Sequence, residues 1–171
     1  HFTRECRMAL RRPGEGMRRN ASLTGLSLWS RRVGDDVGSS PALADLDGDG
    51  VLDVVVGSND RTVWALSGAD ATPLWRFETG GAVESSPAVG DLNGDGIPDV
   101  AVGSDDRRVY ALSGSDGRML WSRETGGRVR ASPALADLDG DRLVDVVVGS
   151  WDKRVYALAG RTGEPLWTVA T

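Results

Sequence analysis

Cysteine and histidine each occur only once in the 171 residues, and lysine occurs once against 19 arginines. The single cysteine, Cys6, excludes a disulfide framework or a thiolate metal cluster within the chain. The single histidine, His1, leaves no histidine for a Ser-His-Asp triad elsewhere, and no phosphate-cradling loop motif occurs. No apolar run approaches the ~18 residues that a membrane-spanning helix needs.

Acidic residues are concentrated in a few places, although the net charge of the chain is only −5. Residues 1–19 hold six arginines and two glutamates, whereas the remaining 152 residues hold 14 basic and 23 acidic groups. Eleven of the 19 aspartates lie in three short segments. Such local acidity favours cation binding, and it argues against a nucleic-acid partner because nucleic acids require a basic surface.

These three segments are copies of one nine-residue sequence that recurs every 46 residues. It reads DLDGDGVLD from Asp45, DLNGDGIPD from Asp91 and DLDGDRLVD from Asp137. A Ser-Pro-Ala segment precedes each copy, a Val-rich run follows it, and a later segment ends in Leu-Trp. A fixed period of this size is typical of repeat architectures.

Each repeat predicts four short strands and no helix. Runs such as 54–56 consist of valines, which favour strands, and they are bounded by Asp and Gly. Their apolar residues stand at consecutive positions, so both faces of the strand are expected to be buried. A small antiparallel sheet that is buried on both faces must stack between copies of itself, as the blades of a β-propeller do.

We therefore predict an all-β fold: a β-propeller fragment of four-stranded antiparallel blades with a 46-residue period, comprising three full blades and the remnant of a preceding one. The expected segments are an unstructured basic lead-in at 1–19, the outer strand of the preceding blade at 20–36, and blades at 37–82, 83–128 and 129–171. Propellers have about four to eight blades. The missing blades of a longer parent chain are therefore expected partners.

The repeated acidic segment has the chemistry of a calcium-binding loop. Its carboxylates alternate with other residues, so a tight turn around a cation brings them inward, and glycines at 48 and 50 permit that turn. All donors are hard oxygens, which suits Ca²⁺, with six to eight ligands at ~2.3–2.6 Å, better than Mg²⁺. The expected ligands are Asp45, Asp47, Asp49, Val51 through its carbonyl, and Asp53; Asp91, Asn93, Asp95, Ile97 and Asp99; and Asp137, Asp139, Asp141, Leu143 and Asp145. The alternative is a solvated Asp/Gly turn without metal.

The three loops are not expected to bind equally. The second has Asn93 in place of an acid, which lowers the ligand charge by one. The third has Arg142 where the others have Gly50 and Gly96, and a non-Gly residue at positive φ costs roughly 1 kcal/mol or more. The sequence therefore predicts up to three Ca²⁺ ions with the third loop weakest, and it leaves open whether that loop binds at all.

Two families resemble these repeats over residues 20–171. The acidic loop, with its Val-rich strand and Gly-Ser, resembles the FG-GAP repeat of integrin-type propellers, in which DxDxDGxxD loops bind calcium. The remainder resembles the pyrroloquinoline-quinone-type repeat of eight-bladed bacterial propellers, whose tryptophan-docking pattern is Ala, Gly six residues later and Trp four beyond. The pattern is met by Ala111, Gly117 and Trp121 and by Ala157, Gly163 and Trp167, whereas the first copy has Ala65, Ala71 and Trp75. Such tryptophans can pack over a neighbouring backbone, so Trp29, Trp75, Trp121 and Trp167 are interpreted as staples.

Neither resemblance identifies catalytic residues in this chain. For quinone-type dehydrogenases the resemblance implies vicinal cysteines, a catalytic Asp and calcium ligands near the axis of a complete ring, and this chain has one cysteine. Fold resemblance does not transfer activity. We therefore expect a calcium-binding propeller segment that is not an enzyme. Two alternatives stay open: an assembly scaffold resembling outer-membrane assembly lipoproteins, and a fragment of a quinone-dependent dehydrogenase.

A secreted, periplasmic or cell-surface location is expected, because extracellular modules bind calcium at ~10⁻⁴–10⁻³ M. Partner binding is expected on the face opposite the acidic loops, where the repeats differ most. Equivalent positions hold Gly38, Glu84 and Arg130 in one turn and Asn59, Asp105 and Trp151 in another. Functional surfaces of scaffolds usually lie on variable loops. A protein or glycan partner is therefore expected there, with Trp151 as the first candidate contact and an incidental exposed aromatic as the alternative.

Overall fold

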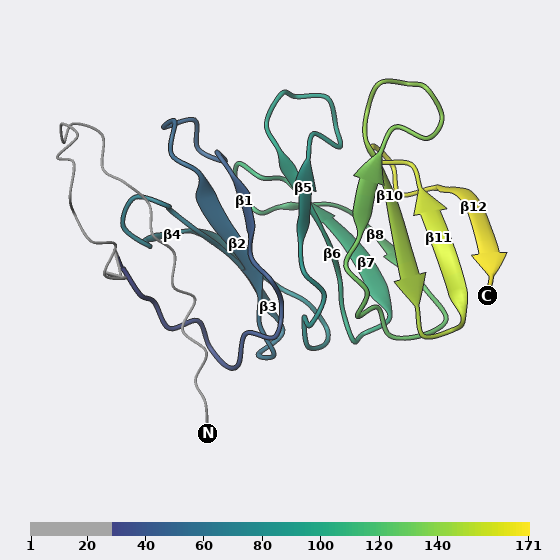
Figure 1. The fold of residues 1–171 in the computed structure, drawn as a ribbon, viewed down its shortest axis with the longest axis horizontal. Helices are drawn as coiled ribbons and strands as arrows, with labels where there is room; N and C mark the ends of the chain where they lie inside the picture. Colours follow the sequence, from purple (N-terminus) through teal and green to yellow (C-terminus); the bar gives the residue numbers. More distant parts are fainter. Residues whose placement is uncertain (1–28) are drawn as a thin grey trace, which may run out of the picture.

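The computed structural model describes residues 29–171, which form three four-stranded antiparallel sheets. The first sheet contains β1 (Ala42–Ala44), β2 (Asp53–Gly57), β3 (Thr62–Leu66) and β4 (Pro73–Glu78); the second contains β5 (Ala88–Gly90), β6 (Asp99–Gly103), β7 (Arg108–Leu112) and β8 (Met119–Glu124); the third contains β9 (Ala134–Ala136), β10 (Asp145–Ser150), β11 (Arg154–Leu158) and β12 (Pro165–Ala170). The sheets stand side by side along the molecule (Figure 1), and each keeps its strands in chain order. The all-β propeller prediction is confirmed, and the sheets are called the first, second and third blades below. No helix in this part of the chain is long and apolar enough to cross a membrane.

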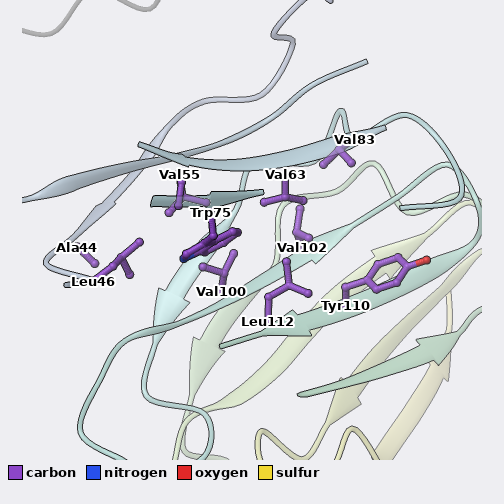
Figure 2. Close-up of a cluster of buried hydrophobic side chains, with 11 residues drawn as sticks. Ala44, Leu46, Val55, Val63, Trp75, Val83, Val100, Val102, Tyr110 and Leu112 are labelled. Carbon is purple, nitrogen blue, oxygen red and sulfur yellow. The ribbon is translucent and has the colours of Figure 1, made fainter. Parts of the chain in front are cut away.

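The hydrophobic core lies between the blades, because each sheet is apolar on both faces. Strands β2 and β6 are buried along their whole length. Figure 2 shows the ring of Trp75 between Val55 of the first blade and Val100 of the second. A second cluster of the same kind fills the space between the second and third blades. Burial on both faces explains why the valines of these strands stand at consecutive positions.

The outer-strand tryptophans join successive blades. Trp75 of β4 donates its indole N–H to the carbonyl of Gly114 in the next blade at 2.6 Å. A Cβ at Gly117 would lie 2.7 Å from the Trp75 ring, so the absence of a side chain leaves room for this approach. Trp121 makes the equivalent bond to Gly160 at 2.6 Å. Trp75 and Trp121 therefore each pack against the motif glycine of the following repeat, Gly117 and Gly163.

The expected lead-in at 1–19 and part of the expected outer strand, residues 20–28, lie outside the described residues. Residues 29–36 contain no strand, since the chain bends at Gly34 (φ 44°) and Asp35. Trp29 still makes the docking bond, donating to the carbonyl of Gly68 at 2.9 Å. Val33 is buried against the first blade. This segment therefore covers the first blade without pairing as a strand.

The third blade shows what the interface buries, because no further sheet follows it in the described part of the chain. Trp167 of β12 is 43% exposed, whereas its counterparts Trp75 and Trp121 are 7% and 8% exposed. Val169 on the same strand is also exposed. The exposed face of β12 is therefore apolar because it corresponds to the surface that packs against the next blade in the first two sheets.

A line of serines connects the segments that lead into the first strands of successive blades. The backbone N–H of Ser40 donates to Ser86 Oγ at 2.8 Å, and the N–H of Ser86 donates to Ser132 Oγ at 3.2 Å. Strand β5 contacts both β1 and β9. The same hydrogen bond is therefore repeated once per blade at the edge where these strands meet.

Candidate metal centres

The acidic loops join the first and second strands of each blade and project from one edge of the molecule, at the top of Figure 1. Asp45 shapes the first loop, because its two carboxylate oxygens accept the N–H groups of Gly48 at 2.8 Å and Gly50 at 3.0 Å. Both glycines have positive φ, 78° and 81°. Asp91 and Asp137 accept the equivalent pairs of N–H groups in their own loops. The first aspartate of each loop therefore curls the backbone.

Three carboxylates of the first loop converge. Asp47 Oδ1 accepts the N–H of Asp49 at 3.1 Å, and Asp49 Oδ1 accepts the N–H of Val51 at 2.7 Å. One oxygen from each of Asp45, Asp47 and Asp49 lies within 4.8 Å of the others. Two ligands of one calcium at ~2.4 Å are at most ~4.8 Å apart. This donor set fits a calcium ion.

The last aspartate of each loop is buried and has backbone partners. Asp53 Oδ2 accepts the N–H of Leu46 at 2.8 Å, and Oδ1 accepts the N–H of Gly68 at 3.1 Å. Asp99 and Asp145 accept equivalent bonds. Asp53 does not belong to the convergent group of its loop. It ties the start of the loop to the turn between β3 and β4.

Burial disfavours the ionised form of two of these aspartates, Asp53 and Asp99. Burial raises the pKa of Asp53, although hydrogen bonds from Leu46 and Gly68 lower it. Burial likewise raises the pKa of Asp99 to about 6, against the hydrogen bonds from Gly114 and Leu92, and the nearby charge of Asp95 adds to the increase. An opposite charge close by favours the ionised form of a carboxyl. A cation in the loop would therefore relieve an unfavourable accumulation of negative charge.

The second loop holds its side chains differently because of Asn93. The side-chain amide of Asn93 donates to Asp95 Oδ2 at 3.0 Å, while Asn93 Oδ1 accepts the N–H of Asp95 at 2.8 Å. Asp95 Oδ1 accepts the N–H of Ile97 at 2.8 Å. Asp91, Asp95 and Asp99 do not form a convergent group of three acids. The amide thus occupies a carboxylate oxygen that a cation would otherwise contact.

The third loop keeps the same backbone course despite Arg142. This residue has φ 75°, close to the 81° of Gly50, and its N–H donates to Asp137 Oδ2 at 3.1 Å. Oxygens of Asp137, Asp139 and Asp145 lie within 4.8 Å of one another. The positive φ at Arg142 agrees with the backbone strain that the sequence predicts there. Three carboxylates converge in this loop despite that strain. Asp139 Oδ1 and Asp141 Oδ1 accept the N–H groups of Asp141 and Leu143.

Sequence reasoning missed the leucine at the second position of each loop. Leu46 is 2% exposed and packs into the core between the first and second blades. Its Cδ2 would lie 3.1 Å from a Cβ at Gly114 of the next blade. Leu92 is fully buried in the corresponding place, and Leu138 of the third loop is 42% exposed. The sequence did contain a signal, because each of the three loops begins with Asp-Leu. This apolar position does not, however, indicate which blade the leucine contacts.

Four of the six residues expected on the opposite face gather where the second and third blades meet. Arg130 donates to Asp105 and pairs with Glu84, and its guanidinium lies over the ring of Trp151. The other two belong to the first blade: Asn59 donates its N–H to the carbonyl of Asp36, and Gly38 has no heavy atom within 4 Å of its Cβ position. The first blade therefore lacks this arrangement.

The acidic loops and the three stacked sheets define a propeller built from FG-GAP-type repeats. The FG-GAP-like repeat family matches residues 45–102 and 91–148, which together span more than half of the chain, and the chain belongs to this family. No curated protein sequence matches it.

Among solved structures, the chain is similar to BamB from Moraxella catarrhalis, a β-propeller protein, with a TM-score of 0.66 and 22% sequence identity. The alignment covers 87% of this chain and 42% of the BamB chain, so the chain spans less than half of the length of that protein. At this level of identity the similarity supports the fold and nothing more.

Proposed function

We propose that the chain is a non-catalytic interaction segment of a β-propeller whose acidic loops bind structural calcium. The observation that carries the proposal is the convergence of Asp45, Asp47 and Asp49 within 4.8 Å in an FG-GAP-like repeat. Asp137, Asp139 and Asp145 form a second group of this kind. The donor chemistry, carboxylates without histidine or cysteine, is that of a calcium site.

Calcium would neutralise the carboxylates and hold each loop in one conformation. Asp53 fixes the backbone of Leu46, and the Leu46 side chain packs against the next blade. The position of the first loop is thus connected directly to the interface between blades. In this proposal the metal stabilises the stack of blades and takes no part in a reaction.

The proposed location is extracellular, periplasmic or at the cell surface, where calcium is abundant enough for loops of modest affinity, ~10⁻⁴–10⁻³ M. The proposed partner, a protein or a glycan, binds the edge opposite the loops. There the turns after β6 and β10 carry residues that differ between repeats, including Asp105 and Trp151. An assembly scaffold that does not need calcium is the second candidate, because the BamB-like fold is compatible with it.

Calcium-dependent melting of the whole chain separates these two functions. A ligand at 100 times its Kd stabilises the folded state by ~2.7 kcal/mol per site, so saturating calcium should raise the Tm clearly above that in chelator. Asp47→Asn should reduce the increase, whereas Glu78→Gln, which removes an exposed acid on β4, should leave it unchanged.

Asn93→Asp provides a gain-of-function test in the second loop. It replaces the amide that contacts Asp95 by a fourth carboxylate and should increase the stabilisation by calcium. Equal melting of the wild-type chain with calcium and with chelator would refute the calcium proposal and favour the scaffold. A quinone that bound and raised the Tm would instead support a dehydrogenase fragment.

A further inference from the structure

Trp151 lies in the turn between β10 and β11, at the edge of the third blade opposite the acidic loops. Its side chain is 62% exposed. The equivalent residues of the first and second blades are Asn59 and Asp105. Most of the surface of Trp151 is therefore accessible to a ligand. The third repeat thus differs from the first two because it exposes a large apolar ring where they have polar side chains.

The indole is held in place by a backbone hydrogen bond and by two guanidinium groups over its ring. The backbone N–H of Trp151 donates to the carbonyl of Arg128 at 2.9 Å. The guanidinium of Arg130 lies 4.7 Å from the ring centroid, and that of Arg128 lies at 5.9 Å. Cation–π contacts of this length favour a fixed ring orientation. A ligand that stacks on Trp151 would therefore meet a surface that is already ordered.

Arg130 is itself fixed by two acids from two other turns. Its Nε and Nη2 donate to the two oxygens of Asp105 at 2.8 and 2.6 Å, a bidentate pair. Its Nη1 lies 2.9 Å from Glu84 Oε2. Arg128 also pairs with Asp105, at 3.6 Å, but half of its side chain remains exposed. The indole thus rests on a network that spans the junction of two blades.

The charges in this network cancel. Glu84 and Asp105 contribute two negative charges, and Arg128 and Arg130 contribute two positive charges. A strongly anionic or cationic ligand therefore gains little net attraction at the site. The exposed indole surface favours an apolar ligand surface, while the exposed parts of Glu84 and Arg128 can accept and donate hydrogen bonds beside it. These features together select a neutral ligand with one apolar face and polar groups around it.

We propose that Trp151 and the surrounding charged side chains form a binding site for a pyranose ring of a neutral glycan. The sugar would stack its C–H face on the exposed surface of the indole and direct hydroxyls toward Glu84 and Arg128. This inference rests on the proposed function as an interaction module and names its ligand class.

A peptide fits the site less well than a sugar. The N–H groups of Trp151 and Lys153 donate to the carbonyls of Arg128 and Ser150, so these donors of the turn are already used. The N–H of Asp152 points to Ser150 Oγ at 3.4 Å. A peptide strand added to a sheet edge needs free main-chain groups, and this turn offers few. Recognition at the site therefore depends on side chains.

The test is binding of the calcium-loaded whole chain to an array of neutral oligosaccharides, including gluco-, manno-, galacto- and chito-oligomers. Any positive oligosaccharide is then titrated by calorimetry. We expect Trp151→Ala to weaken binding at least about tenfold, as expected for the central aromatic residue of an interface, and Trp151→Phe to retain part of it. Trp167→Ala is the matched control because it removes another exposed indole, on the uncovered blade face, and should leave binding unchanged.

The calcium-dependent rise in Tm is measured on the same samples, so that a failure of the glycan inference is distinguishable from a failure of the proposed function. No binding of any neutral glycan at millimolar concentration by protein that shows this rise would overturn the glycan inference alone. Equal binding by the wild-type and Trp151→Ala chains would overturn it as well. Glycan binding that depends on Trp151 without any calcium effect would support the site and contradict the calcium proposal.

Discussion

Leu46→Ala tests whether the acidic loop of one blade stabilises the next. Leu46 is 2% exposed among Trp75, Val100 and Leu112, so truncation removes three carbon atoms from a packed interface. Buried Leu→Ala substitutions cost ~2–5 kcal/mol. A loop can partly collapse into the space, which places the expected loss of unfolding free energy at about 3 kcal/mol.

Leu138→Ala is the matched control, since it makes the same chemical change in the same position of the third loop. Leu138 is 42% exposed and has no following blade in the described chain. We expect a loss below about 1 kcal/mol for this substitution, as for most surface changes. The two variants therefore differ only in whether the leucine has a neighbouring blade to pack on.

Urea unfolding followed by tryptophan fluorescence, in saturating calcium, measures both losses. With an m value of ~2 kcal/mol per molar urea, Leu46→Ala should lower the midpoint by about 1.5 M and Leu138→Ala by less than about 0.5 M. Equal shifts in the two midpoints would show that burial between blades does not set the contribution of this leucine.

Two further changes probe the interfaces and loops. Burial, together with the hydrogen bond to Asp106, raises the pKa of Tyr110 from 10.0 to about 12. The contribution of the neutral Tyr110 side chain to stability is therefore complete below pH 10. It is lost as the pH rises to 12, because the unfolded chain ionises first, and the loss is about 2–3 kcal/mol. Tyr110→Phe should remove most of the fall in the urea midpoint between pH 10 and pH 12. The same pH dependence in this variant would show that Tyr110 does not cause the fall. Arg142→Gly relieves a positive φ and removes a cation beside the third loop. The apo chain should gain roughly 1 kcal/mol of stability from the relieved strain. Calcium affinity at this loop should rise about fivefold in a calcium titration; an unchanged affinity would show that Arg142 does not weaken the loop.

The stacked sheets were predictable because the period of the sequence is the period of the fold. Consecutive valines in 54–56 indicate burial on both faces, and only stacking of equivalent sheets provides it. Trp75 was interpreted as a staple because a tryptophan on an outer strand can pack over a neighbouring backbone, and its indole donates to the carbonyl of Gly114. The partner itself, the glycine of the following repeat, follows only from the spatial stacking.

Other features depend on contacts that the local sequence does not contain. Asp53 stays a predicted calcium ligand. Its two backbone partners, Leu46 and Gly68, could not be predicted because they lie on either side of it in the chain and meet only after folding. The segment 29–36 matches an outer strand by its spacing, yet a strand needs a partner to pair with, and the chain bends at Gly34 instead.

The cluster around Trp151 likewise comes from separate turns. Glu84, Asp105 and Arg130 are brought together by the stacking of two blades, and no nearby pattern in the sequence links them. What could be predicted was the variability of these positions. Their pairing depends on the rotation between neighbouring sheets.

The serine line sets a geometric limit on any complete ring. Each link from one backbone N–H to the next hydroxyl, Ser40 to Ser86 and Ser86 to Ser132, holds neighbouring first strands at one separation. A ring closes only when the turn made per sheet divides a full circle, and that turn depends on how closely the inner edges approach. The length of this repeated hydrogen bond therefore influences how many sheets a complete ring contains and how wide a central channel they leave.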